Sequence, residues 1–208
     1  MGLAVDERQA LSALFEEVGP EAPTLCEGWA TRDLAAHLIV REHRLDASPG
    51  IMLPALAGYT KRVQDQYAAK PWAELVDEVR RGPAWYWPMA IGPLNELTNG
   101  GEFLVHHEDV RRAQPGWEPR PADPSRDEAA WRLARQSAKL NLRKSPVGVE
   151  LKTTDGRSAL VKAGSPVVTV TGDPVDLALF VFGRDAVHLT FEGDESAVAR
   201  LQGLRRGV

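Results

Sequence analysis

The chain has 208 residues, of which 43% are hydrophobic and 26% charged, and its formal net charge is −4 at pH 7. These values are typical of a soluble globular protein that can bury a hydrophobic core without disulfide bonds or structural metal ions. The length fits one large domain, or one domain plus a small one. The composition excludes an internal disulfide, because Cys26 is the single cysteine. No basic stripe is present, so we expect no nucleic-acid partner.

The beginning of the sequence contains acidic residues and lacks the basic segment and apolar run of a signal peptide. No apolar run is long enough to cross a bilayer. A single cysteine fits a reducing compartment best. We therefore expect a cytoplasmic protein without a membrane partner.

Apolar residues at helical spacing predict that helices dominate as far as residue 144. We expect helices at 5–18, at 32–46, at 54–69, over a shorter stretch after Pro71, from about Pro93 to Pro115, and at 126–143. In the third of these, Leu56, Tyr59 and Val63 are predicted to face the core. The aromatic, proline-broken stretch 84–92 is expected to be an ordered loop packed on the helices and a candidate pocket wall.

The apolar period changes after residue 144. Alternating apolar residues predict strands at 147–151, 159–161 and 167–170, with the hairpin signal Asp155-Gly156 between the first two. A helix opened by Asp173-Pro174, a strand at 187–191 and a helix at 195–204 follow. The expected fold class is therefore α+β, with a helical domain at 1–144 and a small α+β domain at 145–208.

The fifth predicted helix carries the pattern that points most directly to chemistry. Glu102, His106 and Asp109 are spaced i, i+4 and i+7, so they lie on one helix face. In the second predicted helix, His37 interrupts an apolar stripe, where a buried imidazole needs a partner, and Arg41 lies one turn further on. If the two helices face each other, two imidazoles and a carboxylate converge.

Two imidazoles and one carboxylate suit Zn²⁺ and also fit Fe²⁺ or Ni²⁺. Three protein ligands leave one coordination position for water or substrate, which is the catalytic arrangement. Asp109 is expected either to accept a hydrogen bond from His106 or to bind substrate. The residues alone leave alternatives open: a solvated helix face, a hydrogen-bonded core histidine at position 37, or an ion pair between Arg41 and Asp109.

Three further residues are expected outside the centre of such a site. Cys26 is interpreted as a packing residue, since no base is evident beside it. His107 points about 100° away from His106 and is expected at the periphery. Arg184, which follows Phe182-Gly183, is either a surface residue or an anion binder.

Two separated runs resemble the motifs of one known family. They are Thr24-Leu-Cys-Glu-Gly-Trp29 with Asp33-Leu-Ala-Ala-His-Leu38, and Gly101-Glu-Phe-Leu-Val-His-His-Glu-Asp-Val-Arg-Arg112. They resemble the N-terminal signature and the second metal motif of the mycothiol-dependent maleylpyruvate isomerase family. That family belongs to the DinB-like group of metal-binding four-helix bundles. The resemblance covers about residues 8–115 and is specific because both motifs occur in the right order.

The resemblance implies zinc held by His37, Glu102 and His106, with mycothiol as cosubstrate. It implies an isomerase or S-transferase that acts on a small electrophile, in detoxification for example. Arg41 and Arg184 are then expected to hold substrate carboxylates, the latter from a segment similar to a trimmed second domain of the isomerase.

Two hypotheses of other classes stay open. One is a non-catalytic metal-binding bundle that acts as a sensor or interaction module. The other is a purely structural helical bundle in which His37 and Glu102 are each other's polar partners. We expect a monomer or a weak homodimer.

Overall fold

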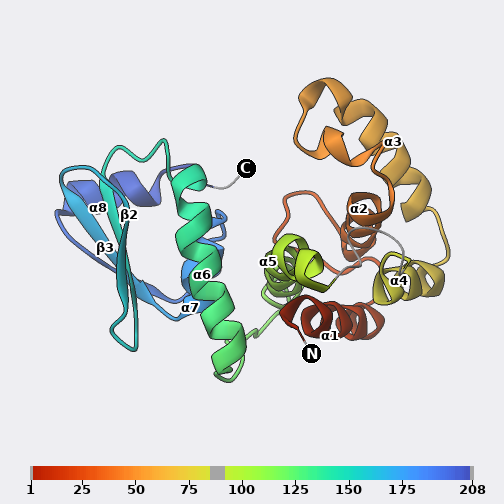
Figure 1. Ribbon diagram of the computed structural model, residues 1–208, viewed down its shortest axis with the longest axis horizontal. Coiled ribbons are helices and arrows are strands. Elements are labelled where there is room, and N and C mark those ends of the chain that lie inside the picture. Colours follow the sequence, from red (N-terminus) through yellow and green to blue (C-terminus); the bar gives the residue numbers. More distant parts are fainter. Residues whose placement is uncertain (1, 85–91, 207–208) are drawn as a thin grey trace. The chain divides into compact units, whose positions relative to one another are not determined.

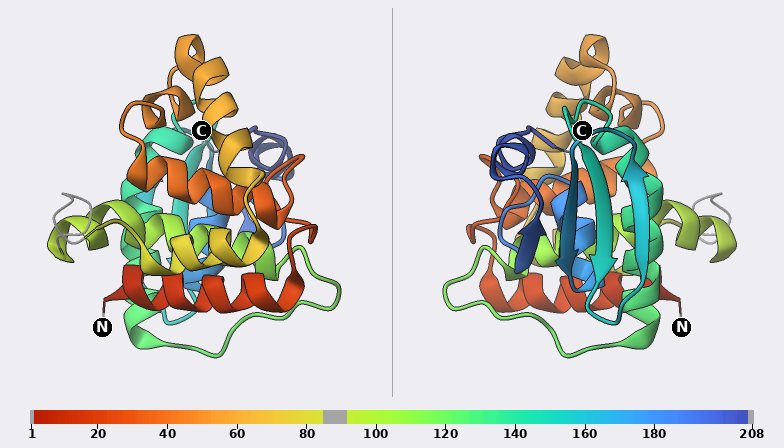
Figure 2. Two further views of the ribbon diagram at one scale, coloured as in Figure 1. Left: turned by 90° about the vertical axis from the view of Figure 1, so that its right-hand side faces the viewer. Right: turned by 90° about the vertical axis from the view of Figure 1, so that its left-hand side faces the viewer.

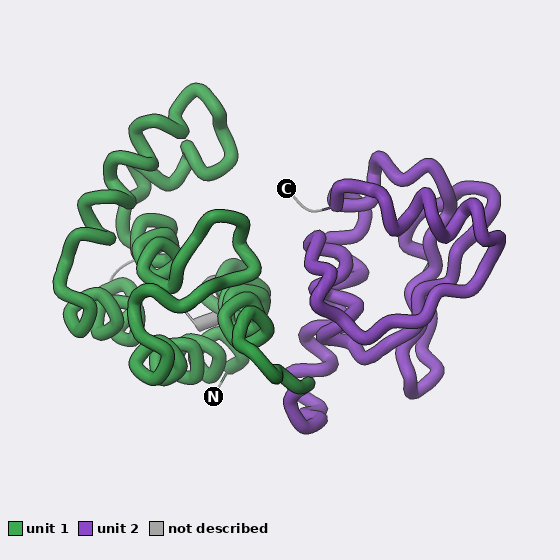
Figure 3. The backbone as a smooth tube through the Cα atoms, turned by 180° about the vertical axis from the view of Figure 1, so that it is seen from behind, with its two compact units in different colours: residues 1–119 green, residues 120–208 purple. Residues whose placement is uncertain are grey.

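The chain is an α+β protein made of two compact units, residues Met1–Pro119 and Arg120–Val208 (Figure 3). The computed structural model describes residues 2–84 and 92–206. Within these residues the first unit is helical, and the second combines helices with a four-stranded sheet. The expected fold class is confirmed at this level.

The first unit contains the first five helices that the sequence predicts. Its elements are α1 (Leu3–Val18), α2 (Thr31–His43), the 3₁₀ turns η1 (Ser48–Ile51) and η2 (Pro54–Leu56), α3 (Ala57–Ala68), α4 (Trp72–Arg81) and α5 (Gly92–Arg111). Residues 85–91, most of the stretch predicted as an ordered aromatic loop, lie outside the described residues.

The core of this unit lies between α1, α2, α4 and α5. Helix α1 packs against α5 and α4, and α2 packs against α3 and α4 (Figures 1 and 2). The largest fully buried side chains of this core are Leu11, Phe15, Leu34, Leu38, Ile39, Leu75 and Phe103. The predicted ligands His37 and Glu102 lie next to core side chains, namely Leu34 and Leu38 on α2 and Phe103 on α5. Core packing therefore fixes the rotation of both helices about their axes.

The buried face of α3 differs from the prediction. Thr60 and Val63 are buried, whereas Leu56 and Tyr59 are 42% and 38% exposed. The residues from 51 to 59 are all apolar or glycine, so their sequence has no polar face from which to read a helical period.

The second unit forms one mixed sheet with three helices among its described residues. Its elements are α6 (Pro124–Asn141), β1 (Gly148–Thr153), β2 (Ser158–Lys162), β3 (Val167–Gly172), α7 (Pro174–Val181), β4 (Leu189–Glu192) and α8 (Glu195–Gln202). The strand order is β2-β1-β3-β4, with β1 parallel to β3 and the other two pairings antiparallel. The predicted hairpin at Asp155-Gly156 joins β1 to β2.

The boundary between the units falls earlier than expected. Helix α6 packs on α7 and also contacts β2, so it belongs to the second unit. Its fully buried Ala130, Ala134 and Ala138 let the helices approach closely. The change of sequence period at residue 144 marks the end of α6, and the boundary itself lies at residues 119 and 120.

Among the described residues, no helix is both long enough and apolar enough to cross a membrane.

Candidate metal centre

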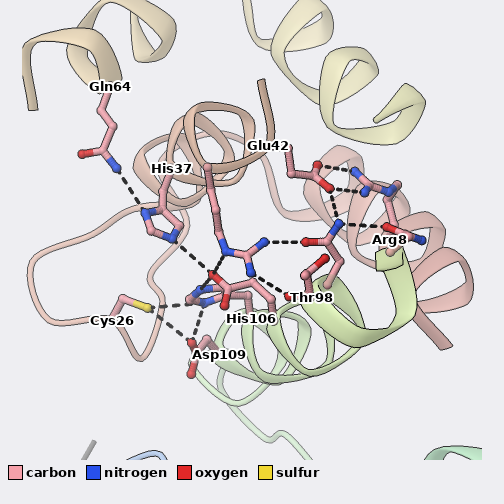
Figure 4. Close-up of polar contacts among 12 residues, drawn as sticks. Arg8, Cys26, His37, Glu42, Gln64, Thr98, His106 and Asp109 are labelled. Atoms are coloured by element: carbon pink, nitrogen blue, oxygen red, sulfur yellow. Dashed lines mark hydrogen bonds and ion pairs between the residues drawn. The ribbon is translucent and has the colours of Figure 1, made fainter. Parts of the chain in front are cut away.

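Helices α2 and α5 bring the three predicted ligands together. Figure 4 labels two of them, His37 and His106. The Nε2 atom of His37 lies 3.4 Å from Oε1 of Glu102, and Nε2 of His106 lies 3.3 Å from the same oxygen. One ligand atom from each residue lies within 4.8 Å of the other two. We call these residues the His–Glu cluster; their predicted convergence is found in the structure.

The distances in the His–Glu cluster fit a four-coordinate cation. Zn²⁺ binds nitrogen and oxygen ligands at about 2.0–2.1 Å, so tetrahedral ligand atoms lie about 3.3–3.4 Å apart. Both distances to Glu102 Oε1 match this spacing. In the part of the chain that the structure describes, no fourth His, Cys, Asp or Glu joins the group. The donor set therefore suits a borderline cation that keeps a position for another ligand.

Local structure fixes both histidine rings. The side chain of Asp33 accepts a hydrogen bond from the Ala30 backbone N–H at 3.0 Å and so caps the start of α2. The ring of His37 lies 5.0 Å from that of Trp29 and 5.5 Å from that of His106, between ring centroids. The two imidazoles are thus held edge to face in an aromatic environment.

Asp109 orients His106. This aspartate is fully buried, and its Oδ2 lies 2.9 Å from Nδ1 of His106. When Nδ1–H donates to the carboxylate, the lone pair of Nε2 faces Glu102 and is available to a cation. Of the two roles predicted for Asp109, this geometry favours holding His106 over contact with substrate.

Gln64 on α3 contacts the other ring nitrogen of His37. Its amide Nε2 lies 3.1 Å from Nδ1 of His37. For Nε2 of His37 to bind a cation, Nδ1 must carry the proton, and Gln64 must then present its amide oxygen. A rotation of the amide by about 180° supplies that acceptor. Gln64 can therefore hold His37 as Asp109 holds His106.

Arg41 holds the carboxylate of the cluster. Its Nε lies 3.3 Å from Oε1 of Glu102, while its two terminal nitrogens donate to Asn99 Oδ1 at 2.5 Å and to the Thr98 carbonyl at 2.6 Å. These contacts anchor the guanidinium to α5. The sequence predicted a residue that binds substrate carboxylates, and the structure adds a positioning role on Glu102.

A buried polar network supports Arg41 from behind. Asn99 is fully buried and donates its amide N–H to Oε1 of Glu42 at 2.8 Å. Glu42 in turn pairs through both carboxylate oxygens with Arg8 of α1. The network therefore connects the cluster to three helices.

The charges of the cluster follow from burial and pairing. Burial lowers the pKa of His37, although its hydrogen bond to Glu102 opposes the shift. Burial would lower the pKa of His106 too, but hydrogen bonds with Asp109, Cys26 and Glu102 outweigh it and raise that pKa well above 6.5. Burial acts to raise the pKa of Glu102, yet hydrogen bonds with both histidines hold it well below 4.5. A cation thus meets an ionised carboxylate and has to displace a proton from His106.

One edge of the His–Glu cluster is open to solvent. The side chains of Glu102 and Arg41 are 26% and 24% exposed, whereas His37 and His106 are buried. Glu102 and Arg41 therefore form the partly exposed edge of the cluster.

Cys26 lies closer to the site than the sequence indicated. Its Sγ is 3.3 Å from Oδ2 of Asp109 and 3.8 Å from Nδ1 of His106. The prediction that no base lies beside this thiol is therefore wrong. The cysteine is within the 24–29 motif, which was the available signal, but its neighbours come from α5.

Two other predicted residues lie elsewhere. His107 pairs with Glu7 of α1, with 2.7 Å between Nδ1 and Oε2, so it stands outside the His–Glu cluster. Arg184 belongs to the second unit, where its Nη1 donates to the Phe182 carbonyl at 2.8 Å. Its role as a substrate ligand stays a prediction.

Gln64 and Asn99 are the site residues that the sequence analysis missed. Asn99 lies three residues before Glu102 and so on the same face of α5, a signal that was available. No such signal was available for Gln64, because the sequence did not show which face of α3 is buried.

Comparison of the chain with protein-family models, with curated proteins and with solved structures gave no match. The fold and the site define an α+β protein whose helical unit carries a candidate cation-binding cluster. Its chemistry has to be inferred from its own residues and contacts.

Proposed function

We propose that the protein is a metal-dependent enzyme that uses a low-molecular-weight thiol of the mycothiol type to isomerise or conjugate a small electrophile. The observation that supports this most is the convergence of two imidazoles and one carboxylate beside a partly exposed edge. Three ligands and an accessible fourth position are typical of catalytic rather than structural metal sites. The motifs at 24–38 and 101–112 support a DinB-like bundle and a thiol cosubstrate.

His37, Glu102 and His106 would hold the cation, with Zn²⁺ as the first choice and Ni²⁺ or Fe²⁺ as alternatives. A cation bound there stabilises a thiolate and so lowers the pKa of a thiol that binds beside it. Glu102 serves as a ligand in this proposal and is therefore not also the general base.

The surrounding residues orient the ligands and the substrate. Asp109 and Gln64 fix the two imidazole rings, and Arg41 fixes the carboxylate of Glu102. A guanidinium has five N–H groups, so Arg41 keeps donors beyond its three contacts with α5. On the exposed edge these donors can bind a substrate carboxylate.

The thiolate would react with a conjugated double bond by forming a carbon–sulfur bond as the π electrons move onto the adjacent carbonyl oxygen. Rotation about the resulting single bond and loss of the thiolate would isomerise a maleylpyruvate-type substrate. With an epoxide, carbon–sulfur bond formation would break one ring carbon–oxygen bond, and the alkoxide that stays in the product would take up a proton. With an activated halide, the halide ion would leave. In both cases the conjugate is the product. The isomerase and the S-transferase therefore use the same residues.

Metal content tests the ligand set. The chain, purified without chelator and loaded with Ni²⁺, should hold about one ion. His37→Ala and Glu102→Ala should lose it. His43→Ala, on the same helix as His37 but outside the cluster, is the matched control and should retain it. Wild-type Ni²⁺ content in both cluster variants would refute the ligand assignment.

Turnover tests the thiol chemistry. The Zn²⁺-loaded protein is mixed with mycothiol and a panel of electrophiles: a maleylpyruvate-type acid, an epoxide and an activated halide. We expect thiol-dependent consumption of at least one of them, and its loss in His37→Ala. A loaded protein that neither binds the thiol nor turns over any electrophile would instead support a non-catalytic metal-binding module.

A further inference from the structure

Cys26 places a sulfur atom beside the ring nitrogen of His106 that the His–Glu cluster does not use (Figure 4). Its Sγ lies 3.8 Å from Nδ1 of His106 and 3.3 Å from Oδ2 of Asp109, and these last two atoms are 2.9 Å apart. We call Cys26, His106 and Asp109 the thiol cluster. Its three possible ligand atoms lie within 4.8 Å of one another.

The backbone fixes this arrangement. The amide N–H of Leu25 donates to the carbonyl oxygen of Asp109 at 3.0 Å, which ties the loop to α5. The next amide, of Cys26, donates to Oγ1 of Thr24 at 3.1 Å. Hydrogen bonds from two consecutive backbone amides therefore position the residue that carries the sulfur.

The distances in the thiol cluster fit around one cation. With metal–sulfur bonds of about 2.3 Å and metal–nitrogen or metal–oxygen bonds of about 2.0–2.1 Å, tetrahedral geometry separates sulfur from either other ligand by about 3.5 Å. It separates nitrogen from oxygen by about 3.3–3.4 Å. The observed distances of 3.8, 3.3 and 2.9 Å each differ from these values by less than about half an ångström. Small side-chain rotations would close that difference.

The donor set selects a different class of cation from the His–Glu cluster. Thiolate ligands favour soft or borderline ions such as Cd²⁺ and Zn²⁺, whereas Mg²⁺ and Ca²⁺ take oxygen ligands. Asp109 is fully buried and His106 nearly so, so a cation would neutralise a carboxylate that is shielded from water.

We propose that the thiol cluster is a second cation site, specific for thiophilic divalent ions, which competes with the His–Glu cluster. The two clusters share His106, and a neutral imidazole has a single nitrogen lone pair. A cation on Nε2 leaves the Nδ1–H group to Asp109. A cation on Nδ1 leaves the Nε2–H group to donate to Glu102. A thiophilic ion in the thiol cluster therefore removes His106 from the first site.

Cadmium is a direct probe, because Cys26 is the single cysteine and any thiolate-to-cadmium charge-transfer absorption in the ultraviolet reports on it alone. Titration of the metal-free protein with Cd²⁺ should produce this absorption and saturate at about one ion per chain. His37→Ala should keep the absorption, since His37 lies outside the thiol cluster. Cys26→Ser, and Cys26→Ala as a second variant, should lose it. No absorption in the wild type, or its loss in a folded His37→Ala variant, would refute the site.

Competition tests the shared histidine. The protein loaded with Ni²⁺ is treated with Cd²⁺, and the released Ni²⁺ is measured after gel filtration. The wild type should release most of its Ni²⁺, and Cys26→Ser should retain it. Retention of both ions on each wild-type chain would refute the competition. The His37→Ala and Cys26→Ser variants each remove one site, so failure of the thiol cluster is distinguishable from failure of the proposed function.

Discussion

Adjacent histidines of α5 have very different surroundings. His107 points toward α1, where its Nδ1 lies 2.7 Å from Oε2 of Glu7. His106 lies toward α2 and contacts Glu102 through Nε2 and Asp109 through Nδ1, with Cys26 also in reach. Both imidazoles are buried, at 6% and 9% exposure.

The difference shows that burial alone does not mark a functional histidine. A buried ion pair such as that between His107 and Glu7 fixes the packing of α1 on α5, which is a structural role. In the His–Glu cluster, one carboxylate oxygen of Glu102 faces His37, His106 and Arg41 at once, which is more than a structural pair requires. Among the described residues, His106 belongs to groups of possible metal-ligand atoms and His107 to none, and this separates the two histidines.

Replacing a histidine with alanine should give the largest difference between the pair of His107 with Glu7 and the His–Glu cluster. We expect His107→Ala to lower the free energy of unfolding by roughly 3 kcal/mol, because it leaves Glu7 buried without this partner. His37→Ala should cost less, since Glu102 is partly exposed and water can solvate it. Urea unfolding of the metal-free variants measures both values. A His37→Ala variant that loses more stability than His107→Ala would reverse the comparison.

Added cation should stabilise only proteins with an intact His–Glu cluster. At a free Ni²⁺ concentration about 100-fold above the dissociation constant, binding to the folded state raises its stability by about 2.7 kcal/mol. The wild type and His107→Ala should gain this amount and His37→Ala little of it, in urea unfolding with and without Ni²⁺. An equal gain in His37→Ala would place the stabilising cation elsewhere.

The sequence predicted the parts of the site that depend on helical spacing. Glu102, His106 and Asp109 share a face of α5 because of their separation, and His37 stood out within the apolar stripe of α2. The α+β class followed equally directly from the change of period after residue 144.

The other features of the site and fold depend on contacts between residues far apart in the chain, which the sequence did not predict. The base beside Cys26 is 80 residues away in the chain, so no local pattern reveals it. Gln64 was missed because the apolar run 51–59 conceals the face of α3. Helix α6 was assigned to the first domain because its alanine face does not indicate which unit it packs against.

The carboxylates that hold the two neighbouring histidines should differ in their effect on cation binding. Asp109→Asn should weaken Ni²⁺ binding about 10- to 100-fold, as loss of a carboxylate behind a ligating histidine does in other metal sites. Glu7→Gln, the matched change behind His107, should leave the affinity unchanged. Calorimetric titration measures both. An equal loss in the two variants would mean that α5 responds as a whole and that Asp109 has no special part.

The smallest expected effect concerns His43, another histidine of this unit, which lies beside the carboxylate of Glu78. Its Nδ1 is 3.7 Å from Oε1 of Glu78, and its buried Nε2 has no hydrogen-bond partner among the described residues. Burial lowers the pKa of His43 below its ordinary value of 6.5. The unfolded chain therefore takes up a proton near pH 6.5, while the folded chain does so only at lower pH. This contribution to stability is complete above that pH and declines as the pH falls toward the folded-state pKa. Urea midpoints of metal-free protein, measured between about pH 8 and about pH 5, should fall less steeply for His43→Gln than for the wild type. Identical slopes would show that the protonation of His43 is not linked to folding.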